Sequence, residues 1–165
     1  MSERTDKQGF TLGLALLDAV PVAAFGIDMA LLARPLQSRL FLAGAVLSLA
    51  AGTCMVIYKL LLATVRKEVP TLKKAMPVGM SLGWILMIAG LIINRAKVSA
   101  AGIWKAVSAP PACIFFLLGI AFFAAFIIFF KTGFDADSAK DNWIEEILNA
   151  GAQVCILAGV MMSVR

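Results

Sequence analysis

Five long apolar runs divide this chain, and they restrict its possible folds more than any other feature of the sequence. The runs cover about residues 10–33, 40–65, 76–94, 112–130 and 143–164. A helix needs about 20 mostly apolar residues to cross the hydrocarbon core of a bilayer, which is close to the length of each run. Apolar residues follow one another within the runs instead of alternating with polar ones, so a transmembrane β-barrel is not expected. The sequence therefore predicts an all-α integral membrane protein, a bundle of five transmembrane helices in a single domain over residues 1–165.

The composition excludes an ordinary soluble domain. Hydrophobic residues make up 61% of the chain and charged residues 15%, whereas soluble domains average about 45–50% and about 25%. The formal net charge of +5 suits loops that lie beside anionic lipid. No segment interleaves basic and aromatic residues in the manner of a nucleic-acid surface. We therefore expect membrane lipid as a partner and no nucleic acid.

The distribution of basic residues predicts an orientation. With five spans, nine Lys and Arg residues fall on the side of the N-terminus, with Lys59 counted there, and six fall on the side of the C-terminus. The side richer in Lys and Arg faces the cytoplasm in most membrane proteins. We expect a cytoplasmic N-terminus and an external C-terminus, in a bacterial cytoplasmic (inner) membrane.

Small residues recur at four-residue spacing in four of the runs. Helices in lipid associate through close packing at such positions. The first run carries Ala15, Ala19 and Ala23, and the strongest candidates in the other runs are Gly44, Ser48, Gly52, Gly79, Gly83, Gly151 and Gly159. These faces could pack within the chain or against a second copy. The G-x-x-x-G pattern of Gly79 and Gly83 is the motive for a homo-oligomer hypothesis.

Two carboxylates interrupt the first run. A carboxylate at the centre of a bilayer costs about 2.5–3.5 kcal/mol on insertion scales, so it is usually paired, protonated or beside water. Asp18 and Asp28 are ten residues apart, a rotation of about 280°, so we expect them to face different directions in a straight helix. Pro21, between them, predicts a kink. Asp28 could instead form a boundary ion pair with Arg34 or Arg39.

Further polar groups fall in the same half of the predicted bundle as Asp18. Lys59, near the end of the second run, could pair with Asp18 or extend alone to the lipid headgroups. In the fifth run Asn149 and Gln153 stand at i and i+4, and Glu146 and Asn142 continue that polar stripe. Amides of this kind serve as hydrogen-bond partners between helices. They could also join Asp18 and Lys59 around one hydrated cavity.

Two local patterns predict structure at the ends of the runs. Asn142, with Glu145 three positions later, has the spacing of a capping box, which places the start of the last helix at about residue 143. Residues 96–109 contain Trp104 and Lys105 and predict a turn of helix at the membrane interface.

Motifs for catalysis and metal binding are lacking. The chain has no histidine, which removes the commonest general base and metal ligand. Its three cysteines fall in three different apolar runs and form no C-x-x-C pair, so they are expected to pack as small apolar residues. No catalytic residue, metal or cofactor is predicted.

The polar groups in the runs favour a transport function. We expect a transporter, channel or transport subunit for a small solute or ion. Its candidate binding residues are Asp18, Asp28, Lys59, Asn149 and Gln153, since ionisable groups within spans accompany ion and solute pathways. The alternative is a non-catalytic assembly or accessory subunit that binds partner helices. A lipid-active enzyme is the least favoured class.

Overall fold

Helices make up all the regular structure in the described part of the chain. The computed structural model describes residues 11–97, 99–135 and 138–163. Its five long helices are each long and apolar enough to cross a membrane, as predicted. They are α2 (Leu12–Leu36), α3 (Arg39–Thr64), α4 (Pro70–Ile93), α6 (Ala112–Lys131) and α7 (Ala139–Ser163). The predicted ends at residues 10 and 164 lie outside the described residues.

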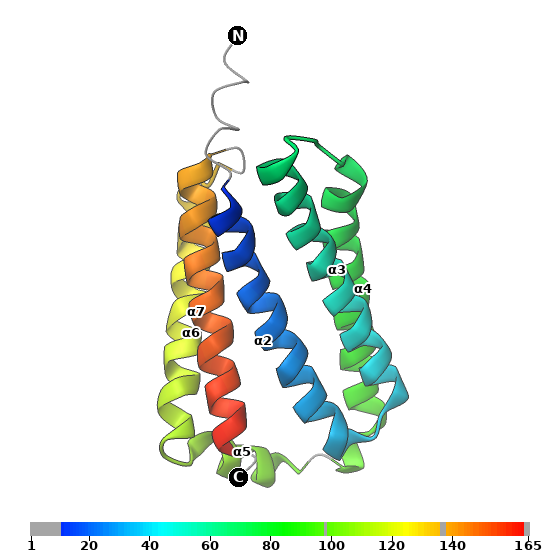
Figure 1. Ribbon diagram of the computed structural model, residues 1–165. Helices are drawn as coiled ribbons and strands as arrows, with labels where there is room; N and C mark the ends of the chain where they lie inside the picture. The colour runs from blue at the N-terminus through cyan, green and yellow to red at the C-terminus, as the bar shows by residue number, and fades with distance from the viewer. Residues whose placement is uncertain (1–10, 98, 136–137, 164–165) are drawn as a thin grey trace.

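Helix α2 lies at the centre of the bundle (Figure 1). It packs against α3 on one side and α7 on the other. The hairpin of α3 and α4 therefore flanks one side of α2, and the hairpin of α6 and α7 flanks the other. Helices α2, α4 and α7 run in one direction, and α3 and α6 run in the opposite one. The start of α2 and the end of α7 consequently lie at opposite ends of the bundle.

Three helix ends differ from their predicted positions. Helix α2 continues through Arg34 and Pro35 to Leu36, because Leu36 is buried in an apolar cluster with Phe41 that extends the helix by a turn. Helix α4 begins at Pro70, about six residues before the predicted start. Proline is favoured in a first turn, where its missing amide would have had no partner.

The predicted capping box at Asn142 is wrong. Helix α7 starts at Ala139, and Asn142 already donates its amide to the carbonyl of Ser138 at 3.1 Å. The Ser138 hydroxyl accepts the amide of Asp141 at 3.3 Å. Ser138 thus supplies the capping hydroxyl four residues earlier than expected, and Asn142 and Glu145 lie within the helix.

The connector between α4 and α6 is partly helical. It contains the 3-10 turn η2 (Arg95–Lys97) and helix α5 (Ala100–Ser108), which starts where the Ser99 hydroxyl accepts the amide of Gly102. Helix α5 lies across the end of the bundle (Figure 1). Ile103 and Trp104 are exposed there, as expected for a helix at a membrane interface.

Glycines allow α3 and α4 to touch along their backbones. A Cβ atom at Gly83 would lie 2.0 Å from Ser48 Oγ, and one at Gly79 would lie 2.7 Å from Ala51 Cβ. The G-x-x-x-G face is therefore occupied inside the chain and leaves no room for a second copy. This removes the observation that motivated a homo-oligomer.

The remaining small residues lie at other helix contacts. A Cβ atom at Gly151 or Gly159 of α7 would lie 2.8 Å or 2.9 Å from the ring of Phe122 or Phe116 of α6. A Cβ atom at Gly52 of α3 would lie 3.0 Å from Val22 Cγ2 of α2.

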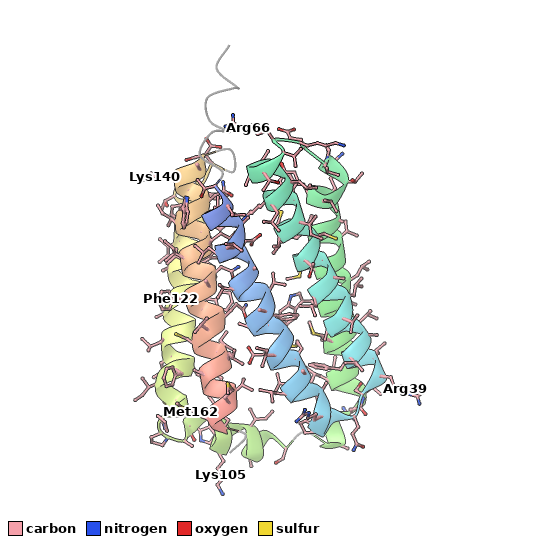
Figure 2. All side chains as sticks on the ribbon, viewed as in Figure 1. Arg39, Arg66, Lys105, Phe122, Lys140 and Met162 are labelled. Atoms are coloured by element: carbon pink, nitrogen blue, oxygen red, sulfur yellow. The ribbon has the colours of Figure 1, made fainter. Side chains whose placement is uncertain are left out.

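On the surface, charged side chains lie at the two ends of the bundle, and apolar ones cover its length. Figure 2 shows Arg66 and Lys140 at one end and Arg39 and Lys105 at the other. Isoleucine, leucine and phenylalanine side chains are exposed between the ends, most of all on α6. A surface of this kind suits a lipid environment.

Candidate functional site

Three charged side chains meet inside the bundle, one from each of α2, α3 and α7. Lys59 Nζ donates a hydrogen bond to Glu146 Oε1, and the two form an ion pair. Asp18 Oδ2 lies 3.6 Å from the same Lys59 Nζ. The exposed fractions are 6% for Asp18, 2% for Lys59 and 3% for Glu146. We call these three residues the charge cluster. Because Lys59 is buried within it, the alternative of a lysine extending to the headgroups is wrong.

The helix directions place the three residues at one level. Asp18 stands six residues after the start of α2, Lys59 five before the end of α3, and Glu146 seven after the start of α7. At 1.5 Å per residue, each lies roughly 8–11 Å from the same end of the bundle. The charge cluster is therefore well inside the apolar length of the helices, in the half nearer the start of α2.

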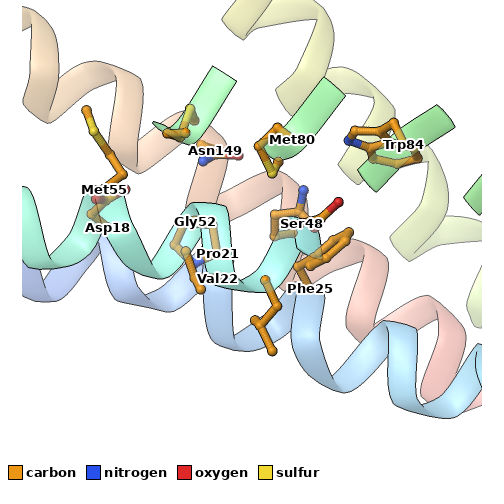
Figure 3. Close-up of a pocket in the computed structure, with 13 residues that line it drawn as sticks. Asp18, Pro21, Val22, Phe25, Ser48, Gly52, Met55, Met80, Trp84 and Asn149 are labelled. Atoms are coloured by element: carbon orange, nitrogen blue, oxygen red, sulfur yellow. The ribbon is translucent and has the colours of Figure 1, made fainter. Parts of the chain in front are cut away.

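A cavity of about 100 Å³ adjoins the charge cluster at Asp18 (Figure 3). It lies between α2, α3, α4 and α7. Its lining residues are Asp18, Pro21, Val22, Phe25, Ser48, Leu49, Gly52, Met55, Met76, Met80, Trp84, Asn149 and Gln153. Asp18, Asn149 and Gln153, three of the predicted site residues, are thus brought together, and Lys59 lies beside them. Helix α2 continues through Pro21, whose ring lines the cavity.

Two buried polar atoms of the cavity lining have no hydrogen-bond partner within the described residues. They are Asp18 Oδ2 and Ser48 Oγ, and in the charge cluster Glu146 Oε2 is in the same condition. An unsatisfied buried polar group costs about 1–3 kcal/mol.

The charge cluster holds two carboxylates against one ammonium group. If both carboxylates are ionised, one negative charge is left without a counter-charge. Charges in the interior of a membrane protein are paired with one another or face water. The composition of the cluster therefore calls for one more positive charge, a proton or a bound cation, beside Asp18 or Glu146.

Glu146 is the member of the cluster that sequence reasoning placed least well. It was expected only as part of the polar stripe, yet it is the residue to which Lys59 donates its hydrogen bond. Its signal was its depth in α7, seven residues from the helix start, against five residues from the helix end for Lys59 in α3. Glu145 beside it is half-buried and adds a further carboxylate near Lys59.

Asp28 lies apart from the cavity. Its side chain is buried, with 2% exposed, and Oδ1 has no hydrogen-bond partner among the described residues. The predicted ion pair with Arg34 or Arg39 is not formed, because Asp28 is eight residues, about 12 Å, from the end of α2 and faces the bundle interior. A rotation of 280° also leaves Asp18 and Asp28 only about 80° apart, so both belong to the buried face of α2.

Comparison of this chain with protein family models, with curated proteins and with solved structures finds no match.

Proposed function

We propose that this protein is a membrane transporter for a small cationic solute, which it exchanges for protons at an intramembrane carboxylate. The observation that supports the proposal is that Asp18 belongs both to the charge cluster and to the cavity lining. Its carboxylate is 3.6 Å from Lys59 Nζ, and the same residue lines the cavity. A cation that enters the cavity therefore reaches a group whose charge state the cluster already controls.

The charge balance of the cluster couples the release of a proton to the binding of a cation. Lys59 of α3 and Glu146 and Glu145 of α7 are the charged groups that face Asp18. With Lys59 bound to Glu146, the carboxylate of Asp18 needs a proton or a cation to remain neutral. Only one of the two can occupy it at a time. Release of a proton then accompanies binding of the cation, and the reverse exchange completes the cycle.

The ion pair also connects the two halves of the bundle. Lys59 Nζ and Glu146 Oε1 join α3 to α7, two helices whose backbones make few contacts with each other. Each of these helices belongs to a separate hairpin packed on α2. A change of charge at Asp18 alters the partners available to Lys59, and this gives cargo binding a means to shift one hairpin relative to the other.

The orientation enters this proposal as a hypothesis. Lys59 belongs to the buried cluster, so the end of the bundle at the start of α2 keeps eight basic residues against six at the other end. The rule for basic residues then still places that end in the cytoplasm. The charge cluster lies in the cytoplasmic half, in a bacterial inner membrane.

Proteoliposomes test the proposal. Purified protein is reconstituted with a pH-sensitive dye inside, and small organic and inorganic cations are added outside one at a time. We expect at least one cation to drive proton efflux through the wild type and not through Asp18→Asn. Asp28→Asn is the matched control, since it removes a buried carboxylate of the same helix that does not line the cavity. Equal fluxes in wild type and Asp18→Asn would overturn the proposal.

A second candidate function is an accessory subunit of a membrane complex. Its support is α6, where only Ala112 and Gly119 are buried. Helix α6 would then bind partner helices instead of lipid. Purification of a stoichiometric partner chain from native membranes would favour this function, and purification of the chain alone would oppose it.

A further inference from the structure

The lining of the cavity is selective in its chemistry. Among the described residues that line it, Asp18 is the single formally charged one, since Lys59 and Glu146 lie behind it in the charge cluster. Most of the remaining wall consists of aromatic rings, thioethers and aliphatic groups. An anion would meet a carboxylate and no basic group there, and a strongly hydrated inorganic cation would exchange its water shell for methyl and thioether groups. The cavity therefore favours a cation with an apolar surface.

Two aromatic rings form the wall remote from Asp18 (Figure 3). Phe25 of α2 and Trp84 of α4 are in tilted contact, with ring centroids 6.3 Å apart. Aromatic faces attract cations whose centres lie within about 6 Å, tryptophan most strongly, and they are the usual recognition element for methylated ammonium groups. Met80 lies between these rings and Asp18 and adds a polarisable thioether.

The distance between Asp18 and the aromatic rings at the other end of the cavity suits one small ion. Phe25 is seven residues beyond Asp18, about 10.5 Å along the axis of α2. An N–H···O hydrogen bond of about 2.9 Å followed by a cation–π distance of about 6 Å spans nearly that length. The cavity volume of about 100 Å³ holds about three water molecules at ~30 Å³ each, which is room for a ligand of only a few heavy atoms.

From this size, charge and wall chemistry, and resting on the proposed function, we propose that the ligand of the cavity is a small methylated ammonium ion. The ammonium N–H donates to the carboxylate of Asp18, which lines the cavity. The methyl groups contact Trp84, Phe25 and Met80. The amides of Asn149 and Gln153 line the same space and bind water or the remaining N–H groups of less methylated ions.

Calorimetric titration of the purified protein in nanodiscs tests this assignment, with trimethylammonium chloride as the probe. We expect saturable binding to the wild type, and binding at least tenfold weaker for tert-butanol, a neutral molecule of nearly the same shape. Tetraethylammonium is expected not to bind, because it is too large. Potassium chloride at equal concentration is expected not to displace the probe.

Two pairs of variants locate the binding. Asp18→Asn is expected to weaken trimethylammonium binding at least tenfold, with Asp28→Asn unchanged. Trp84→Leu is expected to weaken it about tenfold through the lost cation–π contact, with Trp104→Leu on the exposed face of α5 unchanged. Circular dichroism and thermal unfolding identify any variant that fails to fold, and either pair alone decides the matter.

The outcomes separate this inference from the proposed function. Binding of trimethylammonium without any transport would support the ligand class and overturn the transporter. Proton-coupled transport of another cation, with no binding of trimethylammonium, would overturn the ligand class alone. Equal binding of trimethylammonium and tert-butanol, or unchanged binding in a folded Asp18→Asn or Trp84→Leu variant, would also overturn it.

Discussion

Lys59 of α3 and Glu146 of α7 form a buried ion pair between two helices that otherwise make few contacts. Both side chains are less than 5% exposed, and Asp18 of α2 completes the cluster from the helix between them. The pair therefore connects the two hairpins of the bundle through Lys59, whose Nζ also lies 3.6 Å from the cavity carboxylate of Asp18. Lys59 therefore contributes to the stability of the bundle and also to the charge balance at the cavity.

Lys59→Met is expected to be strongly destabilising. It leaves the carboxylates of Asp18 and Glu146 buried together without a cation, and breaking a buried pair in this way costs about 3–5 kcal/mol. The free energy of unfolding in mixed micelles measures the loss. Lys74→Met, at an exposed position of α4, is the matched control. An equal effect of the two substitutions would show that the cluster contributes nothing to the fold.

Asp18→Asn is expected to keep the wild-type stability to within about 1 kcal/mol. The substitution leaves Lys59 with Glu146, a balanced pair, so no charge remains without a counter-charge. Thermal unfolding of the reconstituted protein checks this result. A loss as large as that of Lys59→Met would mean that Asp18, and not Glu146, is the main partner of Lys59.

Gly83→Ala is expected to push α3 and α4 apart. The added Cβ atom would lie 2.0 Å from Ser48 Oγ and 2.7 Å from the carbonyl oxygen of Gly44, and overpacking of this kind costs about 1–3 kcal/mol. The free energy of unfolding is expected to fall while the oligomeric state stays the same. Gly102→Ala on α5, whose nearest neighbour would be Ser99 Cβ at 3.5 Å, should cause no loss. A change of oligomeric state in Gly83→Ala would contradict the intrachain position of this face.

The topology is open to a labelling test. In a chain whose three cysteines are replaced by alanine, single cysteines are introduced at Lys140 and Lys105, which lie at opposite ends of the bundle (Figure 2). A membrane-impermeant thiol reagent applied to intact cells is expected to label the cysteine at position 105 and not the one at 140. Labelling of both would contradict the five-span arrangement, and the reverse pattern would invert the orientation.

The number and approximate extent of the long helices could be predicted from the sequence, because apolar length alone decides what can cross a bilayer. The helix starts at Pro70 and Ala139 could not. Lys73 and Lys74 give the first turns of α4 the composition of a loop. Ser138 is followed by Lys140, Asp141 and Asn142 before the apolar run begins, so the first turn of α7 also has the composition of a loop. Helical periodicity also gives no information on which helices are neighbours, so the same G-x-x-x-G pattern fitted a dimer and an intrachain contact equally well.

The candidate site could be predicted in part, because the bilayer also restricts which polar residues occur within a span. Asp18, Lys59, Asn149 and Gln153 are conspicuous because polar groups are rare in spans, and their depth follows from counting residues. The part played by Glu146, and the separation of Asp28 from the cavity, depend on how α2, α3 and α7 are rotated about their axes. The apolar walls at Met80 and Trp84 carry no sequence signal, because such residues are ordinary in a transmembrane helix.

The proposed transport requires that solutes reach the space beside Asp18 from water, so that this space is a site and not a dry part of the helix packing. Two methionines of α4 test it directly: Met80 lines the cavity, whereas Met87, with 1% exposed, lies in the apolar cluster around Phe41. Each is replaced by cysteine in the chain without native cysteines, and both variants are treated with methanethiosulfonate ethylammonium, a small cationic thiol reagent. We expect rapid modification at position 80, slowed by trimethylammonium, and no modification at position 87. Equal resistance at both positions in the folded protein would contradict the proposal.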